Sequence, residues 1–292
     1  MVEELGSILS NGFNTWKKNL TLCLPFVFSL ILTGIVAIVI IGGAILVVVG
    51  PLLPSLTPYL IDSGEIPPEF MHQLLPQLLQ DIDIIIAAVI ITIILVLLIN
   101  AFFTAGAIGM AKEATEKGRT SLSDMTGYGR RKSISLLFAN LIVGLITLAG
   151  VVFLIPGLIH ALPALRSRTP LDATNLAAFA LLGLGFLVML VYMLTVNIIL
   201  ALSPYAVVID DLGAVKGVKR GYKNFMIHKL DVFLLWLILI VIAVVANIIL
   251  GNIPYLGPWA SLVVSIMVIQ PLGVIWWSRL YLSMREPTAS GA

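Results

Sequence analysis

Histidine, cysteine and paired acidic residues are the residue types in this chain that could do catalytic chemistry. The three histidines, His72, His160 and His228, fall in three different loops, and the single cysteine, Cys23, lies in an apolar run. The chain has no His-Glu-x-x-His or Gly-x-Ser-x-Gly motif, and no phosphate-binding glycine loop followed by Lys-Ser or Lys-Thr. The sequence therefore predicts no catalytic residue, no metal site and no cofactor, and favours a protein that is not an enzyme.

Two acidic pairs, Asp81 with Asp83 and Asp210 with Asp211, stand at the borders of apolar stretches. Carboxylates in such places usually serve as solvated loop charges or as charges near a helix end. The alternative is a metal or acid–base site, for which carboxylate oxygens are also suitable. We expect the ordinary role for both pairs.

The composition of the chain indicates which secondary-structure elements position these residues. Of 292 residues, 60% are hydrophobic and 11% charged, whereas ordinary soluble domains have roughly 25% charged residues. Six apolar stretches reach the roughly 17–20 residues that a membrane-spanning helix needs: about Leu20–Val49, Ile84–Met110, Ile134–Ile155, Leu176–Val208, Val232–Leu250 and Trp259–Ser278. The sequence predicts an all-α integral membrane protein, one membrane domain over residues 1–292 with six transmembrane helices.

The basic residues orient these spans. All but two of the 17 Lys and Arg residues, Arg166 and Arg168, lie in the N-terminal segment, the second and fourth loops and the C-terminal end. Lys and Arg remain on the side of synthesis, so both termini are expected to be cytoplasmic in a multi-pass protein of the cell membrane. The formal net charge of +2 gives no reason to expect nucleic acid as a partner.

A sequence pattern appears three times, each time as a glycine and an aromatic residue followed by basic residues and a pair of spans. The three copies are Gly12-Phe13, Gly127-Tyr128 and Gly221-Tyr222. They predict repeat-like cassettes at about residues 1–110, 111–208 and 209–286, followed by a short tail at 287–292. Each hairpin of spans would follow an amphipathic helix at the cytoplasmic interface. The alternative is that aromatic and basic residues border the spans of any multi-spanning protein.

Three amide side chains, Asn100, Asn197 and Gln270, fall at similar distances from the basic ends of the even-numbered spans. We expect them to form a polar core layer that faces the bundle interior and bonds across helices. Such a layer serves either as packing or as a substrate-binding layer. Pro271 beside Gln270 is expected to kink the last span and to free a carbonyl there.

The segment that begins at Gly213 places glycines every four residues, at Gly213, Gly217 and Gly221, beside a basic stripe. The stripe is a candidate contact for anionic lipid headgroups or phosphate, with ordinary positive-inside charge as the alternative, and it consists of Lys216, Lys219, Arg220 and Lys223. A second group is expected to anchor the protein at the membrane interface, and it consists of Trp16, Trp276, Trp277 and Arg279.

The stretch from Pro204 to Phe225 carries a proline at the end of the fourth span, a short apolar strip, the turn Asp210–Gly213 and a basic amphipathic segment. This order resembles the six-span membrane domain that precedes some bacterial glycerophosphodiester phosphodiesterases, and related uncharacterised prokaryotic membrane-protein families. The chain differs from that pattern at Gly217 and Gly221, where those families often have Ala and Ser. The resemblance implies a fold more than a function, and we expect no phosphodiesterase domain because the chain ends at Ala292, soon after the sixth span.

Two hypotheses for function remain open on these observations. The first is a non-enzymatic scaffold or accessory protein that acts on membrane lipids, on partner membrane proteins or through self-association. The second is a transporter or channel for a weakly charged or apolar solute, which would use the amide layer. A closed core with a basic or apolar outer groove would favour the first hypothesis, and a continuous cavity lined by the three amides would favour the second.

The predicted topology can be tested by cysteine labelling from outside intact cells. Cysteine at Glu65 should react with a membrane-impermeant maleimide, whereas cysteine at Lys117 or Lys219 should be protected, because Lys and Arg mark the cytoplasmic side. The parent protein serves as the blank. Labelling at Lys117 or Lys219 together with protection at Glu65 would mean that the topology is inverted.

Overall fold

The computed structural model describes residues 3–52, 76, 79–167 and 173–285, with side chains left out at 164–167 and 173–175. Within these ranges the chain is helical and has no β-strand. Six helical stretches are long and apolar enough to cross a membrane: Leu20–Val49, Ile82–Lys117, Leu122–Pro163, Leu176–Ile209, Lys229–Gly251 and Gly257–Ser283. The predicted all-α fold with six spans is confirmed.

The helices follow one another as three hairpins. The first consists of α1 (Leu5–Lys18), a 3₁₀ turn (Leu20–Cys23), α2 (Leu24–Ala37), a π-helical turn (Ile38–Gly42), α3 (Gly43–Val49), a 3₁₀ turn (Gly50–Leu52) and α6 (Ile82–Lys117). The second consists of α7 (Leu122–Leu148), a 3₁₀ turn (Ala149–Leu154), α8 (Ile155–Ser167), α9 (Ala173–Ile199) and α10 (Ser203–Ile209). The third consists of α11 (Ala214–Ile227), α12 (Lys229–Gly251), α13 (Gly257–Val264), a π-helical turn (Ser265–Ile269) and α14 (Gln270–Ser283).

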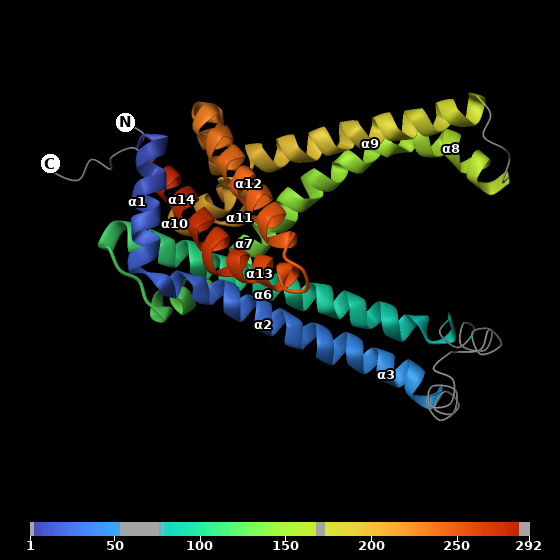
Figure 1. Ribbon diagram of the computed structural model, residues 1–292, viewed down its shortest axis with the longest axis horizontal. Helices are drawn as coiled ribbons and strands as arrows, with labels where there is room; N and C mark the ends of the chain where they lie inside the picture. The colour runs from blue at the N-terminus through green and yellow to red at the C-terminus, as the bar shows by residue number, and fades with distance from the viewer. Residues whose placement is uncertain (1–2, 53–75, 77–78, 168–172, 286–292) are drawn as a thin grey trace.

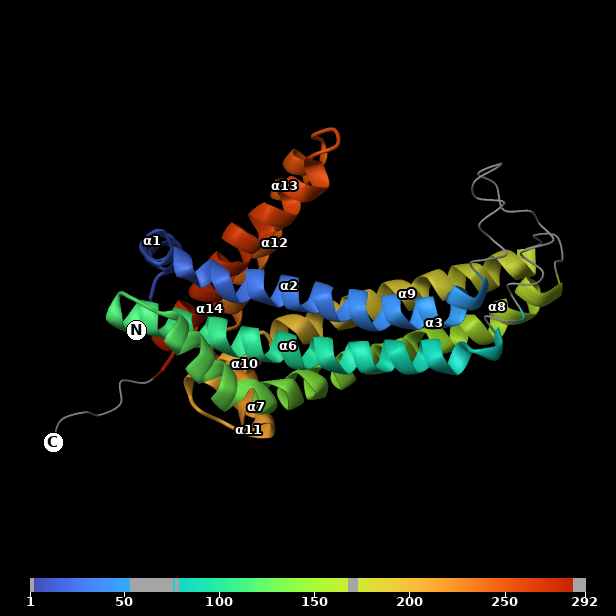
Figure 2. The same ribbon diagram turned by 90° about the horizontal axis from the view of Figure 1, so that it is seen from below.

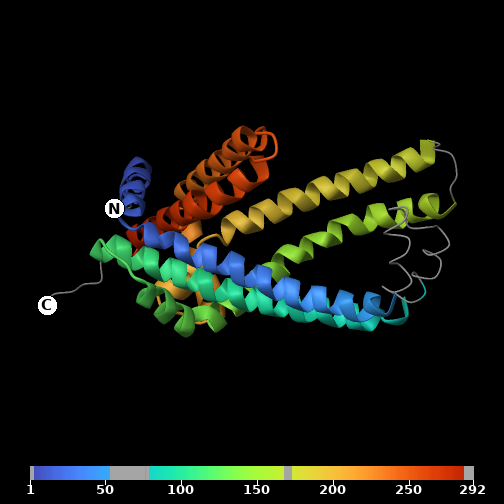
Figure 3. The same cartoon turned by 60° about the horizontal axis from the view of Figure 1, so that its bottom comes forward.

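The three hairpins meet at one end of the molecule and diverge toward the other (Figures 1 and 3). We call the meeting end the base; it holds α1, the α6–α7 turn, α10, α11 and the end of α14 (Figure 2). The most apolar window of each of the first five spans is only 11% buried, and that of the last span is 28% buried. The chain is therefore held together at its base, while most of the span surface is left for lipid or another protein to cover.

Small residues allow α6 and α7 to pack closely at the base. The end of α6 buries a run of alanines and glycines between Ala101 and Ala114. A Cβ atom at Gly109 would lie 2.1 Å from Cγ of Tyr128, and one at Gly129 would lie 2.9 Å from the ring of Phe102. Without hydrophobic attraction between helices in lipid, such close van der Waals packing is a main source of helix association.

The short helix α10 lies at the centre of the base and is buried from Tyr205 to Ile209. It packs against α11, α7 and α6. Gly217 and Gly221 of α11 face α10, since a Cβ atom at Gly221 would lie 2.6 Å from the backbone nitrogen of Ser203. Gly217 and Gly221 therefore let α11 approach α10 closely, whereas a Cβ atom at Gly213 would have nothing within 4 Å.

The middle copy of the predicted cassette differs from the other two. α1 and α11 are separate helices in front of their spans, but α7 runs without a break from Leu122 to Leu148. A capping box begins this helix, in which the Ser121 side chain accepts from the backbone of Asp124 and the Asp124 side chain accepts from the backbone of Ser121. The prediction of a separate interface helix before the third span was therefore wrong, because this segment continues directly into the span.

Replacing Gly221 with alanine should lower stability by about 1–3 kcal/mol, because the added methyl group would press on the backbone of α10. Gly127→Ala is the matched control, since a Cβ atom there meets nothing within 4 Å and alanine favours a helix. Unfolding in detergent, followed by circular dichroism, measures both changes. Equal stability of the two variants would contradict the packing described for α10 and α11.

Candidate functional site

The turn after α10 positions the second acidic pair. Asp211 has the left-handed backbone angle φ of 57°, and the Leu212 N–H donates to the carbonyl of Val207 at 3.1 Å. This is the hydrogen bond of a Schellman helix end, with Asp211 at the position that glycine usually occupies. The turn holds the two carboxylates next to each other at the base.

Asp210 joins three helices of the base. Its carboxylate accepts a hydrogen bond from the hydroxyl of Tyr281 in α14. The Nε of Arg285 lies 3.1 Å from its Oδ1, and the Nε of Arg220 in α11 lies 3.8 Å from its Oδ2. Only 14% of the Asp210 side chain is exposed, so these contacts are shielded from water and link α10 to α11 and α14.

Asp211 pairs with the start of α7. Lys132 Nζ lies 2.5 Å from the Asp211 carboxylate and Arg131 Nε lies 3.4 Å from it. The hydrogen bond from Lys132 is the main reason that the pKa of Asp211 lies below its usual range, so this carboxylate is ionised at neutral pH. Lys132 is buried and also lies 3.5 Å from the carbonyl of Leu212, while Lys112 Nζ lies 3.5 Å from that of Ile209. Positive charge therefore meets the carboxyl end of α10, where it is favourable.

α11 presents three different faces. One face packs on α10 through Gly217 and Gly221, which are buried. A second face is apolar yet exposed, and it consists of Val215, Tyr222 and Met226, with 56%, 47% and 37% of their surface exposed. The third is the predicted basic stripe, in which Lys216, Lys219 and Lys223 are exposed and Arg220 is half-buried beside Asp210. Three of the four predicted contact residues thus form a free basic surface, and the fourth is part of the ion-pair cluster.

The three predicted core amides do not form one layer. Asn100 and Gln270 line the same cavity, but Asn197 lines a different one beside Asn140. All three are exposed, and Asn197 donates to the carbonyl of Met193 in its own helix at 2.8 Å. The prediction of one layer was wrong, because the three hairpins diverge from the base (Figure 3) and only the amides of the first and third line a shared cavity.

The predicted free carbonyl is confirmed at Met267. Pro271 has no N–H to offer to the carbonyl four residues earlier, and two side chains donate to it instead. Trp16 Nε1 lies 3.3 Å and Cys23 Sγ 3.0 Å from the Met267 oxygen. The start of the chain is thereby attached to the last span.

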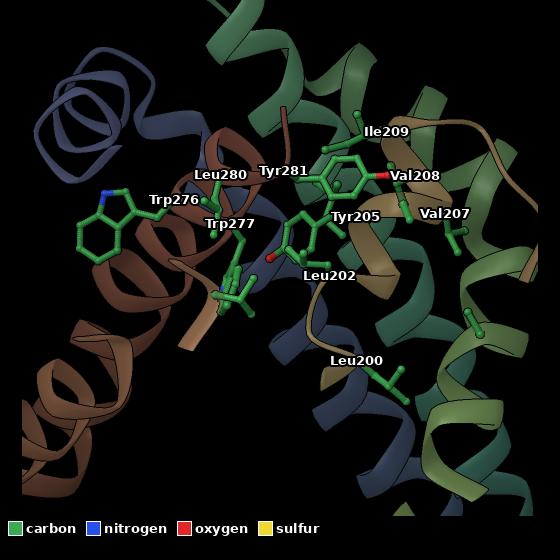
Figure 4. Close-up of a cluster of buried hydrophobic side chains, with 14 of the residues drawn as sticks. Leu200, Leu202, Tyr205, Val207, Val208, Ile209, Trp276, Trp277, Leu280 and Tyr281 are labelled. Carbon is green, nitrogen blue, oxygen red and sulfur yellow. The ribbon is translucent and has the colours of Figure 1, made fainter. Parts of the chain in front are cut away.

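Three of the four predicted interface anchors, Trp16, Trp276 and Arg279, hold the two ends of the chain together. Trp276 and Trp277 are 6% and 9% exposed, and Trp276 Nε1 donates to the carbonyl of Leu9 in α1 at 3.1 Å. Trp277 lies beside Tyr205, with ring centroids 6.3 Å apart (Figure 4). These two tryptophans therefore pack in the core of the base instead of facing lipid headgroups, and Arg279 forms an ion pair with Glu3 at 2.9 Å.

Among the described residues, no group of three or more His, Cys, Asp or Glu side chains could hold a metal ion. His228 lies 3.7 Å from Asp231, and His72, Glu65 and Arg168 lie outside the described residues.

Sequence reasoning missed two sets of residues that have structural roles. Asn19 is buried and connects the start of the first span to the α6–α7 turn, accepting from Thr120 N–H at 3.1 Å and donating to the carbonyl of Gly118 at 3.2 Å. The other set joins Asn100 and Gln270 in their cavity, and it consists of Ser29, Thr33, Thr104 and Ser265. A signal was present, because polar residues four apart within an apolar span share one helix face.

Together, the six apolar helices and the ion-paired base define a multi-pass membrane protein. Residues 70–281 match the family described as a domain of unknown function (DUF7847), and the chain belongs to this family. An uncharacterised protein of Archaeoglobus fulgidus is 24% identical over an alignment of 293 positions that covers 96% of each chain. No solved structure matches the chain.

These comparisons connect the chain to an archaeal relative and to its family. They do not connect it to the membrane domain of the bacterial glycerophosphodiester phosphodiesterases. The order of features from Pro204 to Phe225 therefore stands as a likeness in layout to that domain, and the family assignment rests on the match over residues 70–281.

Tyr281→Phe should lower stability by about 1.5–3 kcal/mol, the usual contribution of a hydrogen bond to a charged group. The Asp210 carboxylate would lose its hydroxyl partner while remaining shielded from water. Tyr255→Phe is the matched control, because Tyr255 is 97% exposed. Thermal unfolding in detergent compares them, and a change no larger than that of the control would mean that the hydroxyl is not a structural contact.

Proposed function

We propose that this protein is a non-enzymatic scaffold or accessory protein of the cell membrane, with both termini in the cytoplasm, that acts on lipids or on partner membrane proteins. The observation that carries the proposal is the outer surface of α11, where an exposed apolar face lies beside three exposed lysines. None of Lys216, Lys219 and Lys223 has an ion-pair partner among the described residues. A helix with these two faces is suited to lie at the boundary between acyl chains and anionic headgroups.

The same end of the molecule offers a second surface of this kind. α1 exposes Phe13, with Lys17 Nζ 4.6 Å from the centre of its ring. Lys18, at the end of the same helix, is also exposed. Because α1 and α11 both belong to the base, their basic side chains favour the same side of a bilayer.

The low burial of the spans supports the same proposal. Large apolar surfaces that the chain does not cover itself are suited to contact with lipid or with partner helices. The alternative, a transporter or channel for a weakly charged or apolar solute, depended on one amide layer. That layer is interrupted, because Asn197 lines a cavity separate from that of Asn100 and Gln270.

Changing Lys216, Lys219 and Lys223 together to glutamine should weaken the preference for anionic lipid. Each lysine near a charged surface contributes about 1 kcal/mol, so the ratio of bound phosphatidylglycerol to bound phosphatidylcholine should fall at least about fivefold. Native mass spectrometry of the purified protein with equal amounts of the two lipids measures this ratio. Arg220 is kept, since it contacts Asp210.

The control variant changes Lys117, Arg119 and Arg130 to glutamine. These residues are exposed at the α6–α7 turn and the start of α7, so the net charge changes equally. The control should keep most of its preference for phosphatidylglycerol. An equal loss in both variants would mean that only total charge matters, and the proposed role of α11 would be wrong.

A further inference from the structure

The first hairpin and the last span line a cavity of about 330 Å³ that opens to the outside of the spans. Its lining residues come from α2, α6, α13, the π-helical turn Ser265–Ile269 and the start of α14. Six uncharged polar side chains line it, namely Ser29, Thr33, Asn100, Thr104, Ser265 and Gln270. The remaining lining residues are apolar, so no charged side chain from the described part of the chain faces the cavity.

The cavity lies within the apolar spans, away from their ends. Asn100 precedes Lys112 by 12 residues, about 18 Å along a helix, and Gln270 precedes Arg279 by nine, about 14 Å. Both distances fall inside a hydrocarbon core that is about 30 Å thick. Polar side chains at this depth are unfavourable unless they have hydrogen-bonding partners.

The lining side chains satisfy one another only in part. Ser29 Oγ donates to Asn100 Oδ1 at 2.9 Å, and Gln270 Nε2 lies 3.3 Å from Ser265 Oγ. The hydroxyl of Thr33 is enclosed and has no hydrogen-bond partner within the described structure. The Asn100 amide nitrogen likewise has no partner among the described residues. Donors and acceptors are therefore available together in the cavity.

A π-helical turn brings two of these residues together. Ser265 and Gln270 are five residues apart, which on a regular α-helix would place them on different faces. The turn at Ser265–Ile269 has the wider π-helical spacing, so both side chains face the cavity. π-helical turns of this kind often mark functional sites.

The rim of the cavity is apolar and exposed. Leu30 and Leu262 line the cavity and have 44% and 39% of their surface exposed. A molecule in the cavity can therefore extend its apolar part along the outer surface of the spans. A volume of about 330 Å³ is within the range of small-ligand sites, roughly 300–1,000 Å³.

We infer that this cavity binds the uncharged, hydroxyl-bearing head of a neutral glycerolipid. The hydroxyl group would bond with Thr33 and the amides of Asn100 and Gln270, while the chains would lie over Leu30 and Leu262. The described residues place no charge in the lining, which disfavours phospholipid headgroups because they would enter without a counter-charge. This inference is independent of the basic surface of α11.

A photoreactive diacylglycerol tests this inference on the full chain in nanodiscs. Labelled peptides should come from α2, α6 and the segment α13–α14. Unlabelled diacylglycerol should compete at least fivefold more effectively than the same lipid with its hydroxyl methylated. Equal competition by the methyl ether would overturn the inference, as would equal competition by phosphatidylglycerol, and neither measurement needs a variant.

The double variant Asn100→Leu with Gln270→Leu should reduce this labelling at least fivefold. The matched control is Asn197→Leu with Asn247→Leu, because both of these amides are exposed and bond to their own helices, outside the cavity. The control variant should be labelled to the same extent as the parent protein. Unchanged labelling in the first pair, or an equal loss in both, would show that the amides of the cavity do not recognise the lipid.

Discussion

The arrangement of the whole chain depends on the ion-paired turn after α10. Asp210 and Asp211 face opposite sets of partners, with Tyr281 and Arg285 on one side and Lys132 on the other. α10 is buried among α6, α7, α11 and α14, so its packing brings together all three hairpins, while the ion pairs of the turn connect the second hairpin to the third. Removing the Asp210 carboxylate would leave a hydroxyl and a guanidinium group without a partner in a poorly hydrated place, which is costly. This turn therefore sets the positions from which the hairpins leave the base.

The two ends of the chain complete this base through a different interaction. α1 packs on α14 because Gly12 leaves space for the indole of Trp276, and a Cβ atom there would lie 2.3 Å from it. The carbonyl that Pro271 leaves free at Met267 then receives Trp16 and Cys23. The carbonyl that lacks its backbone donor in the last span thus becomes the point where the first span is attached.

The spans could be predicted from the sequence, because apolar length alone identifies a helix in lipid. The predicted stretch Val232–Leu250, for example, falls inside α12. Which polar residues meet could not be predicted, since Ser265 and Gln270 share a face only through a π-helical turn. Trp276 likewise has the sequence context of an interface anchor, and its burial depends on Gly12, at the other end of the chain. The ion pairs of Asp210 could not be predicted either, because they depend on how α10, α11 and α14 converge.

A core confined to one end has a mechanical consequence. The hairpins are long, and beyond the base they contact one another little, so a small rotation near α10 moves the far ends by a large distance (Figure 3). Bilayers of different thickness impose different tilts on the helices that cross them. In this chain the packed base alone sets the tilt of the hairpins, because their far halves make few contacts with one another that would resist such a change.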